Sequence, residues 1–227
     1  MEVIVLAGGK GTRLRSKVSD VPKVMADVNG RPFLEYLFEK ISKYEIDKII
    51  LSIGYKKECI KDYFGDCYKN IKIEYSIEDK PLGTGGAIKK ALKLCDNDYA
   101  FVIYGDVYTE IDYDEMNNMY NNEDVYMALK KIKNADRYGI VNINKNKIIS
   151  FEEKKKVEEG LINIGCYIIR KNVLNNYLDD EFFSIENDFF SKWITNYNNS
   201  YYLYNGEFID MGVPNDYDEL IKKLSNR

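Results

Sequence analysis

The run Val3-Ile-Val-Leu-Ala-Gly-Gly-Lys-Gly-Thr-Arg13 joins a short apolar segment to a glycine-rich loop. Residues 3–7 are too few for a helix and rich in β-branched side chains, which predicts a buried strand. The glycines that follow let the backbone approach a ligand and present N–H groups to phosphate oxygens. Eight residues separate Arg13 from Pro22, so the chain has room to bring Lys23 back to the same phosphates. The stretch therefore predicts a phosphate-binding loop with two cations.

Two other phosphate-binding loops are excluded by spacing. A Walker A loop needs Gly-Lys followed by Ser or Thr, whereas Lys10 is followed by Gly11. A dinucleotide-binding fingerprint needs a final Gly or Ala, and here that position is Leu14. A glycine turn with surface cations is the plain alternative. The joint presence of Thr12-Arg13 and Pro22-Lys23 disfavours it.

Outward from this loop, apolar periodicity predicts alternating strands and helices through the first half of the chain. We expect strands at 3–7, 49–53, 71–77 and 99–104, and helices at 32–44, 55–64, 84–94 and 112–122. The second half is richer in strands, at 125–130, 139–143, 147–152, 161–170 and near 201 and 208, with helices at 171–178, 185–196 and 215–224. Such alternation is typical of an α/β fold. We expect a Rossmann-like mixed, mainly parallel sheet flanked by helices, in a single domain over residues 1–227.

Composition and charge argue against several classes of function. The chain has 227 residues, 45% of them hydrophobic, which suffices for one core. A net charge of −4 argues against a nucleic-acid partner. No apolar stretch approaches the ~20 residues of a membrane helix. No signal peptide precedes the four cysteines, so we expect reduced thiols and a cytoplasmic protein without a membrane partner. Histidine is absent, which excludes Ser-His-Asp and Cys-His nucleophiles.

Two further motifs follow predicted strands. Glu78-Asp-Lys-Pro-Leu-Gly-Thr-Gly-Gly-Ala87 predicts a turn and then a helix N-terminus, whose N–H groups suit a base edge or a phosphate. Gly105-Asp106 ends another strand, where ligands bind in open α/β sheets and an aspartate suits Mg²⁺. Read alone, the first is equally a tight strand-to-helix turn and the second an aspartate turn.

Together, Gly9-x-Gly11-Thr12-Arg13 and Pro22-Lys23 resemble the signature of the sugar-phosphate nucleotidyltransferases. The resemblance implies a glycosyltransferase-A-like fold and a Mg²⁺-dependent reaction of a nucleoside triphosphate with a sugar 1-phosphate. It extends over the whole chain through Glu78–Ala87, Gly105-Asp106, Tyr138-Gly139, Glu152-Glu-Lys154, Asn163-Ile-Gly165 and Phe208-Ile-Asp-Met-Gly-Val213.

The resemblance also implies a role for each matching residue. The catalytic residues are Arg13, Lys23 and Asp106, and the metal ligands are Asp106 and Asp210. The nucleotide-binding residues are Leu6, Ala7, Gly8, Gly9, Gly11, Thr12, Glu78, Pro81, Gly83, Thr84 and Gly105. The sugar phosphate-binding residues are Tyr138, Gly139, Glu152, Lys154 and Asn163.

Within the family, the runs Tyr75–Lys89, Gly160–Asn163 and Phe208–Tyr217 resemble the branch that transfers GMP from GTP to a heptose 1-phosphate for surface polysaccharides. Three departures lie near the expected sugar: Ile164 replaces an expected glycine, Val24 a proline and Tyr104 an asparagine. A hexose 1-phosphate with another triphosphate therefore stays open. So do a non-catalytic nucleotide-sugar sensor, a cytidylyltransferase for an amino-alcohol or amino-acid phosphate, and a homodimeric assembly.

Overall fold

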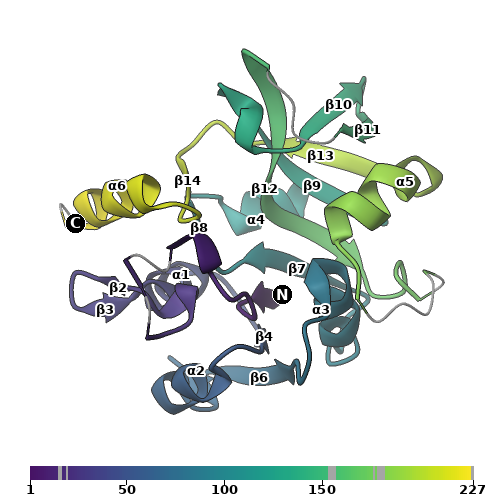
Figure 1. Ribbon diagram of the computed structural model, residues 1–227. Coiled ribbons are helices and arrows are strands. Elements are labelled where there is room, and N and C mark those ends of the chain that lie inside the picture. The colour runs from purple at the N-terminus through teal and green to yellow at the C-terminus, as the bar shows by residue number, and fades with distance from the viewer. Residues whose placement is uncertain (15–16, 19, 153–156, 176, 178–181, 226–227) are drawn as a thin grey trace.

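The computed structural model describes residues 1–14, 17–18, 20–152, 157–175, 177 and 182–225. Four parallel strands form the centre of its main sheet: β1 (Glu2–Leu6), β4 (Lys48–Ile53), β6 (Ile71–Ile77) and β7 (Tyr99–Tyr104) (Figure 1). Every residue of β4 is buried, as expected for a central strand covered on both faces. The predicted parallel order of the first half is confirmed.

Antiparallel strands extend this sheet beyond β7. β12 (Glu159–Arg170) pairs with β7 and with β9 (Val125–Lys133), and β13 (Asn199–Leu203) runs parallel to β9. The hairpin of β10 (Ile140–Asn144) and β11 (Lys147–Glu152) continues from β12, and β5 (Cys67–Tyr68) closes the far edge beside β6. The sheet is therefore mixed with a parallel centre.

Helices cover both faces of the sheet. α1 (Phe33–Ile41), α2 (Lys57–Phe64) and α4 (Tyr113–Met119) share one apolar cluster with Val3 and Val5. α3 (Gly83–Leu92) and the helical segment 185–196 share another with Ile4. Successive residues of β1 thus point to opposite faces, as a strand's period of two requires. The α/β fold class is confirmed.

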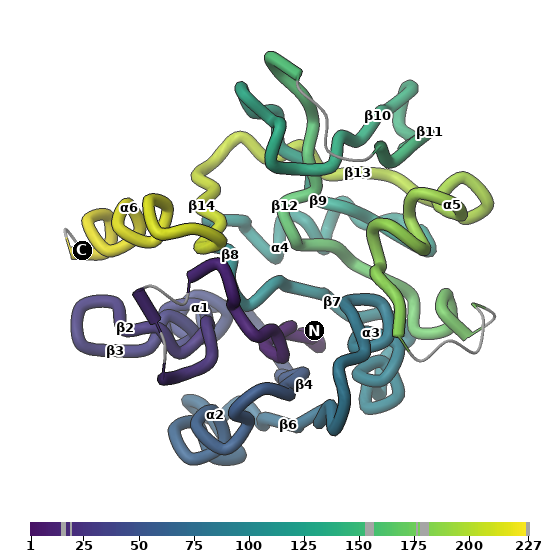
Figure 2. Tube along the Cα trace, in the orientation of Figure 1, coloured from purple at the N-terminus to yellow at the C-terminus, as the bar shows by residue number. Residues whose placement is uncertain are grey.

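Two small sheets lie outside the main one. β2 (Asp27–Val28) pairs with β3 (Arg31–Pro32), and β8 (Val107–Thr109) pairs with β14 (Phe208–Asp210). α6 (Pro214–Leu224) follows β14 and packs in a third apolar cluster with Val28 and Phe33. The tube trace shows the end of the chain lying beside its early segments (Figure 2).

Two predicted helices differ from the structure. Residues 171–175, the first part of the predicted helix 171–178, form turns. There the Asn175 N–H donates to the Asn172 carbonyl at 3.1 Å, which closes a turn, and the two side chains are also hydrogen-bonded at 2.9 Å. Residues 185–196 are helical, but they pass from π-type turns at Ile185–Phe190 through α5 (Ser191–Trp193) to a 3₁₀ turn at Ile194–Asn196.

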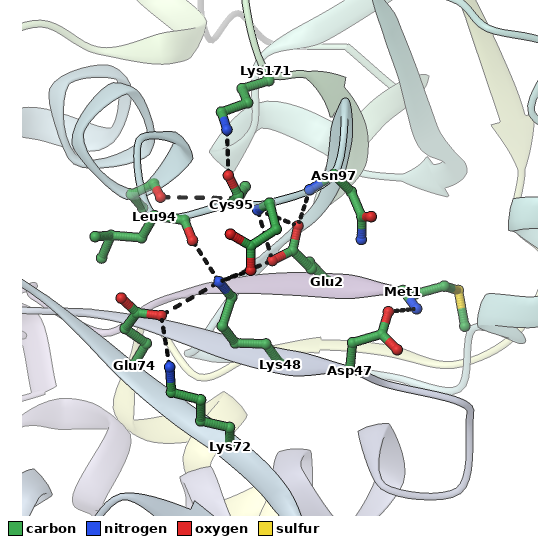
Figure 3. Close-up of polar contacts among 12 residues, drawn as sticks. Met1, Glu2, Asp47, Lys48, Lys72, Glu74, Leu94, Cys95, Asn97 and Lys171 are labelled. Carbon is green, nitrogen blue, oxygen red and sulfur yellow. Dashed lines mark hydrogen bonds and ion pairs between the residues drawn. The ribbon is translucent and has the colours of Figure 1, made fainter.

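A buried ion cluster ties the amino ends of the strands together (Figure 3). Lys48 lies 3.1 Å from the Glu2 carboxylate and 2.8 Å from Asp96, and it donates to the Leu94 carbonyl at 2.6 Å. Burial lowers the pKa of Lys48, but its bonds to Asp96 and Glu2 raise it by more. Glu2 also accepts from two backbone N–H groups, of Asp96 and Asn97. The cluster therefore stabilises the amino ends of the strands. The predicted site lies at the opposite, carboxyl ends.

Replacing Lys48 with methionine is expected to lower the free energy of unfolding by about 3 kcal/mol, because it leaves the buried Glu2 carboxylate without its cation. Urea unfolding followed by circular dichroism measures this. The matched control is Lys72→Met, whose ammonium is largely exposed and lies 3.5 Å from Glu74. It should change stability by less than about 0.5 kcal/mol. Equal effects of the two changes would contradict a structural role for Lys48.

Candidate active site

A cleft of about 1220 Å³ opens at the carboxyl ends of the four parallel strands. The segments after β1, β4, β6 and β7 all contribute to its wall. So do β12 and the β10–β11 hairpin, so residues far apart in the sequence meet there. Of the predicted site residues, the cleft is lined by Leu6, Ala7, Gly8, Gly9, Gly11, Thr12, Arg13, Lys23, Glu78, Pro81, Gly83, Thr84, Asp106, Tyr138, Gly139, Glu152, Asn163 and Asp210.

Two predicted residues are not part of this lining. Gly105 lies just behind it: its N–H donates to the Leu6 carbonyl at 3.0 Å, and a Cβ atom there would lie 2.7 Å from the same oxygen. Gly105 therefore holds Asp106 at the rim by close backbone packing. Lys154 lies outside the described residues.

The glycine loop is packed against both neighbouring motifs. Gly11 has φ +57°, and a Cβ atom on it would lie 2.7 Å from the Lys23 Cβ. A Cβ atom on Gly8 would lie 2.3 Å from a Glu78 carboxylate oxygen. Because real Cβ atoms do not approach this closely, larger residues at these positions would displace Lys23 or Glu78.

One ammonium joins the two predicted metal ligands. The Lys23 Nζ lies 2.6 Å from the Asp106 Oδ2 and 3.9 Å from the Asp210 Oδ1. The pairing of β14 with β8 brings this about, since it sets Asp210 opposite Val107, the residue after Asp106. The backbone N–H of Met211 also donates to the Asp106 carbonyl at 3.0 Å. The structure thus brings Lys23, Asp106 and Asp210 together.

Electrostatics fit a cation at this cluster. Burial, and then the neighbouring Asp106 charge, raise the pKa of Asp210, while Lys23, Arg137 and Arg13 lower it. Two close carboxylates that repel each other gain from a divalent ion between them. Among the described residues no group of three or more metal-binding side chains forms. Mg²⁺ commonly takes one or two carboxylates and completes its shell with substrate phosphates, so this pair suits it.

The Glu78 side chain packs against the glycine loop at Gly8. Its carboxylate accepts from Ser52 Oγ at 3.2 Å and from the Leu82 N–H at 3.1 Å, and burial raises its pKa. The Gly85 N–H donates to the Phe183 carbonyl at 2.9 Å. The N–H groups of Leu82 and Gly85, near the start of α3, are therefore engaged within the protein, and the prediction that this helix end presents donors to a ligand rests on Gly83 and Thr84.

The predicted sugar side is built by the antiparallel strands. Asn163 Oδ1 accepts from the Gly165 N–H at 2.9 Å, and Glu152 accepts from Asn142. The Tyr138 ring packs on Phe208 at 5.6 Å between ring centroids, and burial raises the pKa of Tyr138 to about 12. Tyr138 thus presents a protonated hydroxyl.

Several charged residues of the cleft lining were given no role by sequence reasoning, and two of them are held by contacts to other residues of the lining. Arg137 Nη2 lies 2.6 Å from Asp216 and 4.0 Å from Asp210. Glu186, from the helical segment 185–196, lies in the wall beside Thr84 and Tyr104. Arg137 stands next to a recognised Tyr-Gly pair, which was a usable signal. Nothing in the sequence pattern singled out Glu186.

The three departures near the expected sugar take different positions. Ile164 is 1% exposed and belongs to the core, so its side chain fills the interior more than the cleft. Val24 is likewise buried. Tyr104 is half-buried and lines the cleft. All three contribute to the lining of the cleft, and Tyr104 is the most exposed of them.

Among the described residues, no helix combines the length and apolarity needed to cross a bilayer. The family model described as Nucleotidyl transferase matches residues 2–227. A D-glycero-alpha-D-manno-heptose 1-phosphate guanylyltransferase of Campylobacter jejuni is 44% identical over 96% of this chain and 97% of that protein. Its namesake from Aneurinibacillus thermoaerophilus is 42% identical over 100% of this chain and 99% of that protein.

A solved structure is similar over nearly the full length. The crystal structure of HddC from Yersinia pseudotuberculosis, complexed with GMP-PN, superposes with a TM-score of 0.87. It is 37% identical, and the match covers 98% of this chain and 99% of that chain. The similarity thus extends over nearly the whole fold.

Proposed function

Because the chain belongs to the Nucleotidyl transferase family, we propose that it transfers GMP from GTP to D-glycero-α-D-manno-heptose 1-phosphate, releasing pyrophosphate. Two full-length relatives carry that activity in their names, and the similar HddC structure holds a guanine nucleotide analogue. The observation in this molecule that carries nucleotidyl transfer is the meeting of Lys23, Asp106 and Asp210 beside the glycine loop.

The chemistry needs no general base. A phosphomonoester has a second pKa near 6 and is mostly dianionic at pH 7. One of its oxygens forms a bond to the α-phosphorus of GTP while the bond from that phosphorus to the β-bridging oxygen breaks, and pyrophosphate leaves with the electron pair. A chain without histidine is suited to this reaction, because the protein only positions two anions and neutralises their charge.

Each part of the cleft has a task in this proposal. The loop from Gly8 to Thr12 offers backbone N–H groups to the phosphates, and Arg13 and Lys23 offset the charge that moves to the departing pyrophosphate. Asp106 and Asp210 hold Mg²⁺. When bound, that ion supplies Lewis-acid neutralisation of phosphate charge. Glu78, Pro81, Gly83 and Thr84 face the base and ribose.

In this proposal the sugar phosphate binds in the part of the cleft away from the nucleotide. Tyr138, Gly139, Glu152 and Asn163 line the cleft there, and a carboxylate with an amide suits neighbouring hydroxyls. Lys154 is proposed as the cation of the sugar phosphate. A cytoplasmic location, a homodimeric assembly and a role in surface polysaccharide synthesis remain predictions.

A non-catalytic sensor is disfavoured by the same cluster, because such a protein has no need for Arg13, Lys23, Asp106 and Asp210 together in one cleft. A hexose 1-phosphate enzyme using another triphosphate is the main alternative. An amino-alcohol or amino-acid phosphate cytidylyltransferase is less compatible with Glu152 and Asn163 on the sugar side.

A substrate matrix tests the assignment. Four nucleoside triphosphates are each paired with the heptose, mannose and glucose 1-phosphates, with Mg²⁺ and with EDTA, and pyrophosphate release is measured. GTP with the heptose 1-phosphate is expected to give the highest kcat/KM, and EDTA is expected to abolish turnover. A hexose phosphate that is turned over much faster contradicts the sugar assignment. CTP or dTTP outrunning GTP contradicts the base assignment.

A further inference from the structure

The position of Tyr104 is enforced by the strand beside it. Gly165 has φ +71°, and a Cβ atom on it would lie 2.7 Å from the Tyr104 Cγ. The pairing of β12 with β9 also shifts register between Asn163 and Tyr167, so the backbone bulges at this point. Only a glycine meets both requirements, a left-handed backbone and contact with an aromatic ring. The bulge therefore fixes the position of the Tyr104 ring in the wall of the cleft.

Tyr104 in turn holds the carboxylate of Glu186. Its hydroxyl donates to Glu186 Oε1, and burial, followed by the Glu186 charge, raises the pKa of Tyr104 well above its usual value. The hydroxyl consequently stays protonated and remains a donor. Thr84 Oγ1 and Ser184 Oγ each lie 3.3 Å from Glu186 Oε2. Thr84 Oγ1 also accepts from the Ile185 N–H at 2.9 Å, which ties α3 to the segment that carries Glu186.

This carboxylate has acceptor capacity left over. Two carboxylate oxygens offer about four acceptor positions, and within the part of the chain that the structure describes three hydroxyl groups contact Glu186. Glu186 is half-buried and lines the cleft. It contacts Thr84, on the predicted nucleotide side, and Tyr104, whose ring packs against Gly165 on the predicted sugar side. Among the ligand groups of the proposed reaction, hydroxyls and the N–H groups of guanine can donate to a fixed carboxylate, whereas a phosphate is repelled by it. The packing of Tyr104 against Gly165, two residues after Asn163, favours a hydroxyl of the sugar as the donor.

The geometry points to Glu186 as a specificity-determining residue that accepts a hydrogen bond from a hydroxyl of the sugar, with Tyr104 as the positioning residue that fixes its carboxylate. The inference rests on the proposed function, because it needs a sugar 1-phosphate in the cleft. It adds a second acidic contact to the sugar, besides that of Glu152. It also assigns a positioning role to Tyr104, which departs from the family pattern.

The test compares substrate analogues with protein variants. Steady-state kinetics are measured with the sugar 1-phosphate that the unmodified protein prefers and with its monodeoxy analogues, one for each hydroxyl. For the unmodified protein, removal of the contacted hydroxyl is expected to lower kcat/KM by about 10- to 100-fold, as for a hydrogen bond to a charged group. In Glu186→Met, which keeps the length but replaces the carboxylate with a weakly accepting thioether, this discrimination should fall to within about threefold, and the KM for the sugar 1-phosphate should rise by more than the KM for GTP.

Three further variants separate recognition from folding. Glu186→Gln keeps one acceptor and should retain part of the discrimination, and Tyr104→Phe should give an intermediate loss. Glu219→Gln, an exposed residue of α6 outside the cleft, should behave as the unmodified protein. Full discrimination against every analogue in Glu186→Met overturns the inference. A preferred sugar other than the heptose corrects only the substrate assignment, whereas no turnover of any sugar 1-phosphate by the unmodified protein overturns the proposed function and this inference with it.

Discussion

Replacing Asp106 or Asp210 with asparagine is expected to lower kcat by about 10³-fold, because either change removes half of the charge that would hold Mg²⁺. Asparagine keeps the size of the side chain and removes the negative charge. The measurement is pyrophosphate release at saturating substrates over a range of Mg²⁺ concentrations. Both variants should also lose the thermal stabilisation that Mg²⁺ with GTP gives the unmodified protein.

The unfolding temperature in the absence of metal shows whether the substitution itself destabilises the fold, and so serves as the control. Since the pKa of Asp210 is raised in the fold, its ionised form is disfavoured there, and its contribution to stability is lost as the pH rises through that pKa. At pH 7 in EDTA, Asp210→Asn should therefore unfold at the same temperature as the unmodified protein or a higher one. Metal-dependent activity near the normal level in either variant would remove that carboxylate from the proposed metal site.

Replacing Lys23 with alanine is expected to lower kcat by about 10²- to 10³-fold, the usual cost of losing one group that stabilises developing charge. Lys23 is 9% exposed, packs on Gly11 and faces both aspartates, so its loss also leaves two close carboxylates without a shared cation. Arg13→Ala is expected to have a similar effect, because Arg13 lines the same cleft. Steady-state kinetics with GTP and the sugar phosphate measure both.

Lys17→Ala is the matched control for the cation pair. Its ammonium is exposed, lies outside the cleft lining and pairs with Asp218 at 3.2 Å. It should leave kcat within about twofold, as is usual for an exposed surface ion pair. Near-normal turnover by a folded Lys23→Ala protein would exclude Lys23 from charge neutralisation.

Much of the site was predictable because its motifs directly follow strands. The glycine loop follows β1, the Glu78 block follows β6 and Gly105-Asp106 follows β7. Parallel strands end at one edge of a sheet, so local pattern alone brings these three motifs to one cleft. The position of Asp210 is different, since it depends on the pairing of β14 with β8, whose residues are about a hundred positions apart. Only the family resemblance supplied it.

The remaining features depend on packing that no local pattern records. Glu186 enters the cleft because the segment 185–196 packs in one apolar cluster with α3, through Ile185, Phe189 and Ile88. In the sequence, Glu186 is followed by Asn187 and Asp188, a polar run that is typical of the exposed face of a helix. Likewise, the sequence shows that Ile164 stands where a glycine is expected, but only the structure shows that its side chain is buried in the core beside the cleft lining.

The most direct test of nucleotidyl transfer follows the oxygen atoms of the sugar phosphate. A sugar 1-phosphate labelled with ¹⁸O at its three non-bridging oxygens is incubated with GTP, Mg²⁺ and the protein, and the products are examined by ³¹P NMR and mass spectrometry. The account predicts an unlabelled pyrophosphate and a GDP-sugar in which all three labels are kept, one of them in the bridge between its two phosphorus atoms. Label in pyrophosphate, or release of GMP or GDP without a labelled GDP-sugar, would contradict attack by the sugar phosphate on the α-phosphorus.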